Sequence, residues 1–268
     1  MNSGLCLQTA AWLLLALLTA RAEIIYQTVT PYHSIQVVDQ GDLRILSFDG
    51  AQQTRMSRRD PLAGHFGYTE FFHMPWLWNT NLSNVLMIGL GGGSAQRAYA
   101  HYYTNVVVDT IEIDPAVLRV ARDYFQFKES PRQRVQISDG RVFLRRTQRK
   151  FDAIILDAYT ENRYGSFIPQ HLATKEFFEL ANTRLHANGV LAYNVIGQWR
   201  GGVSDIVGAL YKTLQAVFPQ VYAFKADDSE NVVLIATRWP YRFDFNVLHQ
   251  RASMLISRGQ ITLPTFRQ

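Results

Sequence analysis

The residues Asn84-Val-Leu-Met-Ile-Gly-Leu-Gly-Gly-Gly93 form an apolar run that ends in a glycine-dense turn. Residues 84–88 have the pattern of a buried parallel strand, and residues 94–103 have that of the helix that follows the turn. Three glycines are candidates for contact with a cofactor: Gly89, Gly91 and Gly93. A Cβ atom at these positions would forbid a positive φ or hold a ligand away from the backbone amides. The stretch predicts the first half of a nucleoside-binding βαβ unit, the alternative being a purely structural tight turn.

Acidic residues follow the next predicted strands. Residues 106–114 read as a second strand, whose end carries Glu112 and Asp114 about 20 residues past the glycines. A carboxylate at this distance can accept hydrogen bonds from both hydroxyls of a ribose. Glu112 is therefore a candidate for cofactor binding, whereas Asp114 precedes Pro115 and is better explained as a helix cap.

The third and fourth predicted strands also end in acids. Residues 135–138 are followed by Asp139 and Gly140, and residues 151–156 are followed by Asp157. Ligands of open parallel sheets bind beyond the carboxyl ends of the strands, so these positions are expected to meet at one crevice. Asp139 also suits a helix cap, whereas Asp157 is interpreted as functional.

Outside this region the pattern predicts a second, smaller unit. Residues 34–38 and 43–48 have the pattern of antiparallel strands joined by a turn at 39–42. Residues 67–78 are rich in aromatic side chains and predict a helix beside the crevice, most of it core or subunit contact, with Tyr68 as a candidate for substrate binding. The C-terminal part predicts two helices and three strands, in order: a helix at 174–185, a strand at 190–196, a helix at 205–218, and strands at 221–224 and 232–236.

These elements predict an α/β fold. A mostly parallel sheet with an antiparallel hairpin at its edge follows a small antiparallel β domain. The predicted boundaries are 23–80 for the β domain and 81–268 for a Rossmann-like domain that binds an adenosyl cofactor.

Composition excludes several classes of protein. The 268 residues are 47% hydrophobic and 18% charged with a formal net charge of +5, which describes an ordinary globular chain. A basic cluster follows Gly140: Arg141, Arg145, Arg146, Arg149 and Lys150. Its helical spacing favours a solvated helix face over a nucleic-acid site, because no nucleic-acid-binding motif accompanies it. The seven histidines form no metal-ligand pattern with cysteine or acid, and His171 is interpreted as a capping or surface residue.

The first 22 residues predict a secretory signal peptide. Residues 10–20 are apolar, too short for a comfortable membrane span, and Ala20-Arg21-Ala22 has the small residues of a cleavage site. The only positive charge before residue 10 is the amino terminus, which is atypical of such peptides. A secreted or periplasmic protein is expected, with a cytoplasmic protein as the alternative, and no membrane span is expected after processing.

The linked motifs resemble the spermidine synthase (polyamine aminopropyltransferase) family over roughly residues 31–236. They are Val-Leu-Met-Ile-Gly-Leu-Gly-Gly-Gly, Ile-Glu-Ile-Asp-Pro, Ser-Asp-Gly-Arg and Phe-Asp-Ala-Ile-Ile-Leu-Asp-Ala-Tyr. The resemblance implies a methyltransferase-type Rossmann domain, decarboxylated S-adenosylmethionine as donor, a small-molecule amine as acceptor, and a homodimer.

The resemblance also implies roles for single residues. The glycine loop would face the sulfonium side of the donor, Glu112 would hold the ribose, and Asp139 with Gly140 would meet the adenine. Asp157 would be the acid/base group for the amine. Candidates near the amine are Tyr159, which has packing as its alternative, His33 and Tyr68. The chain looks like a divergent member, because the family has acids where Gly92 and Thr160 stand here.

Three other functions compete with aminopropyl transfer. A methyltransferase would use intact S-adenosylmethionine, and the absence of an acid at Gly92 would relieve repulsion of its carboxylate. A non-catalytic exported protein would bind a nucleoside or a polyamine. A nicotinamide-dependent dehydrogenase is disfavoured, because Ser94 replaces the third glycine of that fingerprint.

Overall fold

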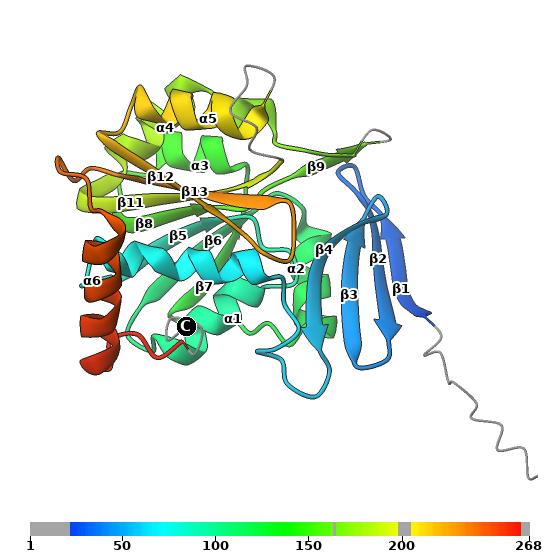
Figure 1. The fold of residues 1–268 in the computed structure, drawn as a ribbon. Coiled ribbons are helices and arrows are strands. Elements are labelled where there is room, and N and C mark those ends of the chain that lie inside the picture. The colour runs from blue at the N-terminus through cyan, green and yellow to red at the C-terminus, as the bar shows by residue number, and fades with distance from the viewer. Residues whose placement is uncertain (1–21, 163–164, 198–204, 264–268) are drawn as a thin grey trace, which may run out of the picture.

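A small antiparallel sheet stands beside a larger mixed sheet that is covered by helices (Figure 1). The computed structural model describes residues 22–162, 165–197 and 205–263. The small sheet has the order β1-β2-β3-β4, and its strands are β1 (Glu23–Val29), β2 (Ser34–Gln40), β3 (Leu43–Phe48) and β4 (Ala51–Ser57). The sequence predicted β2 and β3 but not β1 and β4, whose apolar residues alternate only weakly with polar ones.

The larger sheet has seven strands in the order β12-β13-β11-β8-β5-β6-β7. Their bounds are β5 (Asn84–Ile88), β6 (Val107–Glu112), β7 (Gln133–Ile137), β8 (Phe151–Leu156), β11 (Leu185–Ile196), β12 (Gln220–Lys225) and β13 (Asn231–Thr237). Strands β11, β8, β5, β6 and β7 are parallel, whereas β13 is antiparallel to both β11 and β12. This arrangement confirms the predicted parallel sheet with an antiparallel edge hairpin.

Helices cover both faces of this sheet (Figure 1). They are α1 (Ser94–Tyr102), α2 (Pro115–Tyr124), α3 (Gly140–Arg146), α4 (Lys175–Thr183), α5 (Ile206–Gln215) and α6 (Phe245–Ser257). Helices α3, α4 and α5 share one buried cluster with the sheet, and α1 and α6 share another on the opposite face. The short elements are the 3₁₀ helices η1 (Gly67–Leu77) and η2 (Gln170–Leu172) and the hairpin strands β9 (Thr160–Asn162) and β10 (Gly165–Phe167).

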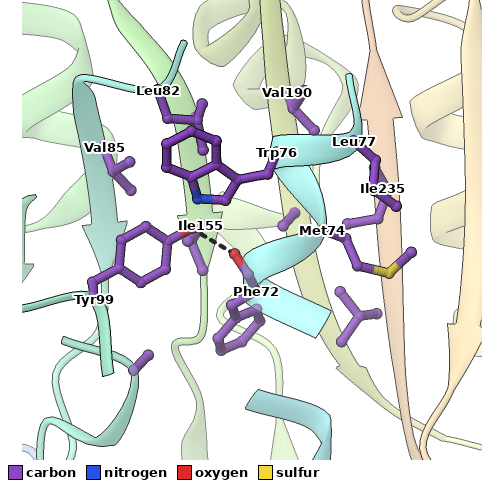
Figure 2. Packing of buried hydrophobic residues seen from close by; sticks show 14 of the residues in the cluster. Phe72, Met74, Trp76, Leu77, Leu82, Val85, Tyr99, Ile155, Val190 and Ile235 are labelled. Carbon is purple, nitrogen blue, oxygen red and sulfur yellow. Dashed lines mark hydrogen bonds between the residues drawn. The ribbon is translucent and has the colours of Figure 1, made fainter. Parts of the chain in front are cut away.

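The aromatic segment η1 packs against the sheet, as most of its side chains were expected to do. Figure 2 shows Phe72, Met74 and Trp76 from η1 facing residues of the sheet, with the Tyr99 hydroxyl of α1 donating to the Phe72 carbonyl at 2.8 Å. The element is a 3₁₀ helix with Pro75 inside it. Tyr68, the second residue of η1, is therefore held against the large sheet by the packing of this element.

The small sheet packs on α2. Ile35, Val37 and Leu46 share a buried cluster with Val117 and Phe125, at the side of the large sheet where β6 and β7 lie. The predicted signal peptide falls almost wholly outside the described residues, which begin at residue 22. In the described part of the chain no helix has the length and apolar character needed to cross a membrane.

Candidate active site

The carboxyl ends of β5, β6, β7 and β8 border a single cavity. The sequence-predicted residues that line it are His33, Tyr68, Gly89, Gly91, Glu112, Asp139, Gly140, Asp157 and Tyr159. They gather because the four strands are parallel neighbours, so their ends lie at the same edge of the sheet. Among the described residues, no three His, Cys, Asp or Glu side chains are grouped so as to hold a metal ion.

The glycine loop lets two strand ends approach each other at backbone distance. Gly89 has φ +102°, and a Cβ atom there would lie 2.0 Å from the carbonyl oxygen of Asp157. The Asp157 amide donates to the Ile88 carbonyl at 2.9 Å, which locks the ends of β5 and β8 together. Gly89 is therefore required for the position of Asp157 as well as for the loop.

Gly93 is the one predicted site residue that the structure does not bring to the cavity. It lies at the N-cap of α1 with φ +75°, and a Cβ atom there would come within 3.0 Å of the Phe127 ring. Its space is taken by protein, so it serves the turn and the packing of α1. Gly140, by contrast, lines the cavity and lies against Ile88, whose Cγ2 would be 2.5 Å from a Cβ atom at residue 140.

Glu112 is buried at the end of β6. Its Oε2 accepts from the Leu90 amide at 3.0 Å and its Oε1 accepts from the Asp114 amide at 2.9 Å. Burial raises the pKa of Glu112 to about 7, although these hydrogen bonds oppose the shift. The carboxylate keeps free lone pairs, so it can accept two hydroxyl donors from a ligand in the cavity.

Asp114 caps α2, as the sequence predicted. Its Oδ1 accepts from the Ala116 amide at 2.8 Å, and its Oδ2 accepts from the Thr30 hydroxyl at 2.6 Å. Thr30 begins the turn between β1 and β2, which also carries His33 to the cavity wall. The cap therefore joins the small sheet to the acid-bearing end of β6.

Asp139 has two roles in the structure. Its Oδ1 accepts from the Val142 amide at 2.8 Å and caps α3, while its Oδ2 lies 2.8 Å from Nε2 of His171. His171 also lines the cavity, and its carbonyl accepts from Arg141 at 2.9 Å. The sequence interpretation of His171 as a capping or surface residue missed this contact, because no local motif links η2 to the end of β7.

Asp157 lies at the end of β8 with both carboxylate oxygens in hydrogen bonds. The Asn194 side-chain amide donates to Oδ1 at 2.8 Å, and the Tyr68 hydroxyl donates to Oδ2 at 3.2 Å. Burial raises the pKa of Asp157, while both hydrogen bonds act in the opposite direction. The group is therefore a carboxylate with raised proton affinity at the wall of a cavity, as general bases often are.

The remaining predicted contacts lie around Asp157 and the small sheet. The Tyr159 hydroxyl donates to the backbone carbonyl of Asn194 at 2.6 Å. The His33 ring stacks on Phe48 with ring centroids 4.3 Å apart, and its side chain is 6% exposed. Tyr159 and His33 thus both line the cavity while being held by protein contacts.

Position 92 is closed to any side chain. The Gly92 amide donates to Thr54 Oγ1 at 2.9 Å, and a Cβ atom there would lie 2.6 Å from Thr54 Cγ2 and 3.0 Å from the Phe125 ring. Behind the loop, the Arg97 guanidinium donates to the carbonyls of Gly92 and Phe125. Burial lowers the pKa of Arg97 to about 10, and no ion pair within the described ranges involves it.

Sequence reasoning missed several residues of the cavity and its supports: Gln53, Thr54, Gln96, His171 and Asn194. Gln96 is 3% exposed, and its amide donates to the Gly89 carbonyl at 3.1 Å. These residues lie inside strands or helices, or in short turns, and carry no spacing pattern. Only the packing of separate elements brings them together.

Comparison with known proteins gives a family for residues 65–227, which match a model described as Spermine/spermidine synthase domain. The polyamine aminopropyltransferase of Vibrio vulnificus (strain CMCP6) is 33% identical over 251 residues, which cover 90% of this chain and 80% of the relative. The eEF1A lysine and N-terminal methyltransferase of Xenopus laevis is 32% identical over 158 residues, covering 57% of this chain and 22% of the relative.

A solved structure of similar fold is a spermidine synthase in complex with the transition-state analogue AdoDATO. Its TM-score is 0.67 at 21% identity, with 91% of this chain and 85% of that chain covered. At this identity the likeness supports the shared fold.

Proposed function

The chain belongs to the spermine/spermidine synthase family, and we propose that it is a transferase that moves an aminopropyl group from decarboxylated S-adenosylmethionine to an amine. The observation that carries this proposal is the gathering of Glu112, Asp139 and Asp157 on one cavity beside the glycine loop. Such a cavity offers acceptors to the hydroxyl and amino groups of a nucleoside, and a carboxylate to an amine.

The adenosyl part of the donor is assigned to the cavity wall formed by β5, β6 and β7. Glu112 accepts the ribose hydroxyls, since its two hydrogen bonds to backbone amides hold it in place. Asp139 with Gly140 meets the adenine, and His171 completes that wall. Gly89 and Gly91 line the cavity and bring their backbone to its wall, where the sulfonium side of the donor is proposed to lie.

Asp157 is assigned the proton transfer. The amine attacks the methylene carbon beside the sulfonium with its lone pair, the carbon–sulfur bond breaks, and its electron pair stays on sulfur as methylthioadenosine leaves. An alkyl ammonium has a pKa of about 10, so the attacking nitrogen must lose a proton near neutral pH. In this proposal Asp157 accepts that proton, which is supported by its position on the cavity wall beside Tyr68 and Tyr159.

The variant Asp157→Asn tests this assignment. We expect kcat to fall about 10²- to 10⁴-fold, because the amide cannot accept the proton. Binding of methylthioadenosine, followed by calorimetry, should stay within a few-fold of wild type, since the adenosyl contacts are untouched. Turnover at the wild-type rate would remove Asp157 from the mechanism.

Methyl transfer from intact S-adenosylmethionine is a second candidate, which one observation favours. Gly92 carries no acid in the glycine loop beside the cavity, and the buried Arg97 cation lies behind that loop. A donor with a carboxylate on its tail would be tolerated there, whereas a purely cationic tail lacks a partner. The similarity to the Xenopus laevis methyltransferase over 158 residues supports this alternative.

Product binding separates the two candidates. Methylthioadenosine and S-adenosylhomocysteine are titrated separately, with NAD as a third ligand. Aminopropyl transfer predicts the tighter binding of methylthioadenosine, and methyl transfer predicts that of S-adenosylhomocysteine. Binding of no adenosyl compound would reject both candidates.

Three finer features belong to this proposal. Residues 1–22 are a signal peptide, residues 23–80 and 81–268 are two domains, with η1 of the first packed on the sheet of the second, and two copies form a homodimer. Mass spectrometry of the protein recovered from its natural host tests cleavage after residue 22, and light scattering tests the dimer. A processed protein that binds methylthioadenosine without turning over any amine would instead favour an exported binding protein.

A further inference from the structure

A chain of buried amides leads from β13 to the carboxylate of Asp157. Asn194 on β11 is 1% exposed, and Asn231 at the start of β13 is 8% exposed. The Asn231 side-chain amide donates to Asn194 Oδ1 at 2.9 Å, and the Asn194 amide donates to Asp157 Oδ1 at 2.8 Å. The three side chains form one continuous hydrogen-bonded row across β8, β11 and β13, which are neighbours in the sheet.

The strand register places these residues beside one another. Tyr193 pairs with Leu156 in the parallel ladder, so Asn194 comes next to Asp157, just past the end of β8. In the antiparallel ladder Asn194 pairs with Val233, which makes Asn231 a diagonal neighbour on the same face. Neither asparagine is among the residues that line the cavity.

Asn231 decides which end of the Asn194 amide faces Asp157. A side-chain amide has an acceptor end and a donor end of nearly equal size, and only the donor end suits a carboxylate. Because Asn231 donates to the oxygen of Asn194, the Asn194 NH₂ group is left to point at Asp157. Tyr159 adds a second restraint, since its hydroxyl donates to the Asn194 backbone carbonyl.

This row holds one oxygen of the Asp157 carboxylate on the sheet side and leaves the other on the side of the cavity. Oδ1 is held on the sheet side by Asn194, whereas Oδ2 meets the hydroxyl of Tyr68, a residue that lines the cavity. We propose that Asn194, oriented by Asn231, is a positioning residue that holds the Asp157 carboxylate so that Oδ2 receives the proton of the acceptor amine. This inference rests on the proposed function of Asp157.

The other titratable groups near Asp157 do not supply this restraint. Tyr68 comes from η1, Tyr159 follows β8, and burial raises the pKa of both phenols well above the ordinary value. Asp228, in the turn between β12 and β13, acts on Tyr68 through its charge. Burial raises the pKa of Asp157, and the hydrogen bonds that Asn194 and Tyr68 donate both favour its ionised form; only that of Asn194 comes from the sheet side.

Two variants test the proposal away from the substrate. Asn194→Ala removes the donor, and Asn231→Asp replaces the donor behind it with an acceptor of nearly equal size, so that two carboxylates compete for the one Asn194 NH₂ group. In both variants we expect kcat to fall about 10- to 100-fold, as the loss of a hydrogen bond to a charged group predicts. The acidic limb of the pH profile of kcat should move to higher pH, because the pKa of Asp157 rises when its ionised form loses a hydrogen-bond donor. The KM for the donor should stay unchanged.

Asn84→Ala is the matched control. Asn84 lies at the amino end of β5, where its amide donates to the Ser83 hydroxyl, so the profile of this variant should match that of wild type. Calorimetric binding of methylthioadenosine checks that each variant is folded. Wild-type pH profiles in both Asn194→Ala and Asn231→Asp would overturn the proposal.

Titration of the Asp157 carboxyl carbon by NMR needs no turnover. If wild type transfers no aminopropyl group, the proposed function fails, while a higher titration midpoint of Asp157 in both variants still supports the positioning row. An unchanged midpoint contradicts the row, whether or not the enzyme is active.

Discussion

At the scale of single residues, Gly89 joins the glycine loop to the catalytic candidate. Its positive φ and the closeness of the Asp157 carbonyl exclude a side chain for two separate reasons, one conformational and one steric. The same residue therefore lines the cavity and sets the position of Asp157 at the end of β8.

Gly89→Ala should both destabilise the protein and lower its activity. The backbone conformation alone costs about 1–3 kcal/mol for a residue with a Cβ atom, and the 2.0 Å approach to the Asp157 carbonyl adds to this cost. Gly50→Ala is a close control, since Gly50 has φ +92° but no atom within 4 Å of the added Cβ. Urea unfolding should give a larger loss for Gly89→Ala, and equal losses would refute the steric part of the argument.

At the scale of elements, β4 supports the glycine loop from a different sheet. Thr54 is 6% exposed, and its hydroxyl accepts from the Gly92 amide while its methyl group closes position 92. The small sheet thus forms part of the cavity wall. Thr54 and Phe125 fill the space where a side chain at position 92 would lie.

Thr54→Val should destabilise the loop with little change in shape. The methyl group that replaces the hydroxyl leaves the Gly92 amide without its acceptor, at a cost of about 1–3 kcal/mol for a buried donor. The free energy of unfolding, measured with urea, checks this value. Thr54→Ser keeps the hydroxyl that accepts from the Gly92 amide, so we expect a smaller loss of unfolding free energy. Equal losses for serine and valine would show that this hydrogen bond does not stabilise the loop.

At the scale of the whole molecule, the site reduces stability at neutral pH. Burial raises the pKa of Glu112 from 4.5 to about 7, so the folded state binds a proton that the unfolded chain releases between these values. The folded state then binds more protons than the unfolded state, and stability falls as pH rises through this window. The acid that is proposed to hold the ribose therefore destabilises the ligand-free protein when it is ionised.

The variant Glu112→Gln measures this effect. From pH 4.5 to pH 7 the free energy of unfolding of wild type should fall by about 3 kcal/mol relative to the variant, whose residue 112 does not titrate. Comparison of the two proteins cancels the contribution of Asp157, which is common to both. Urea unfolding at four pH values checks the slope; a difference that does not vary with pH would show that Glu112 titrates normally.

The features of the fold and the site that depend on neighbouring residues in the sequence were predictable, whereas those that depend on contacts between distant residues were not. The strands at β5, β6 and β8 and the acids that follow them were readable, because buried parallel strands are apolar runs and their ends share one edge. Gly93 was assigned to the cofactor because a glycine-rich loop looks uniform in sequence. In the folded structure Gly89 and Gly91 line the cavity, whereas Gly93 lies against Phe127, from the segment after α2.

The sequence by itself determined the class of fold, the crevice at the strand ends and the acids that face it, since these follow from local hydrophobic pattern and from the order of parallel strands. The tertiary structure alone decided which atoms surround those acids. Thr54, His171 and Asn194 each reach the site from an element distant in sequence, at a hydrogen-bond distance that no local pattern encodes. The physical reason is that a side chain's partner across a sheet or between two sheets is fixed by register and packing, which arise only when the whole chain has folded.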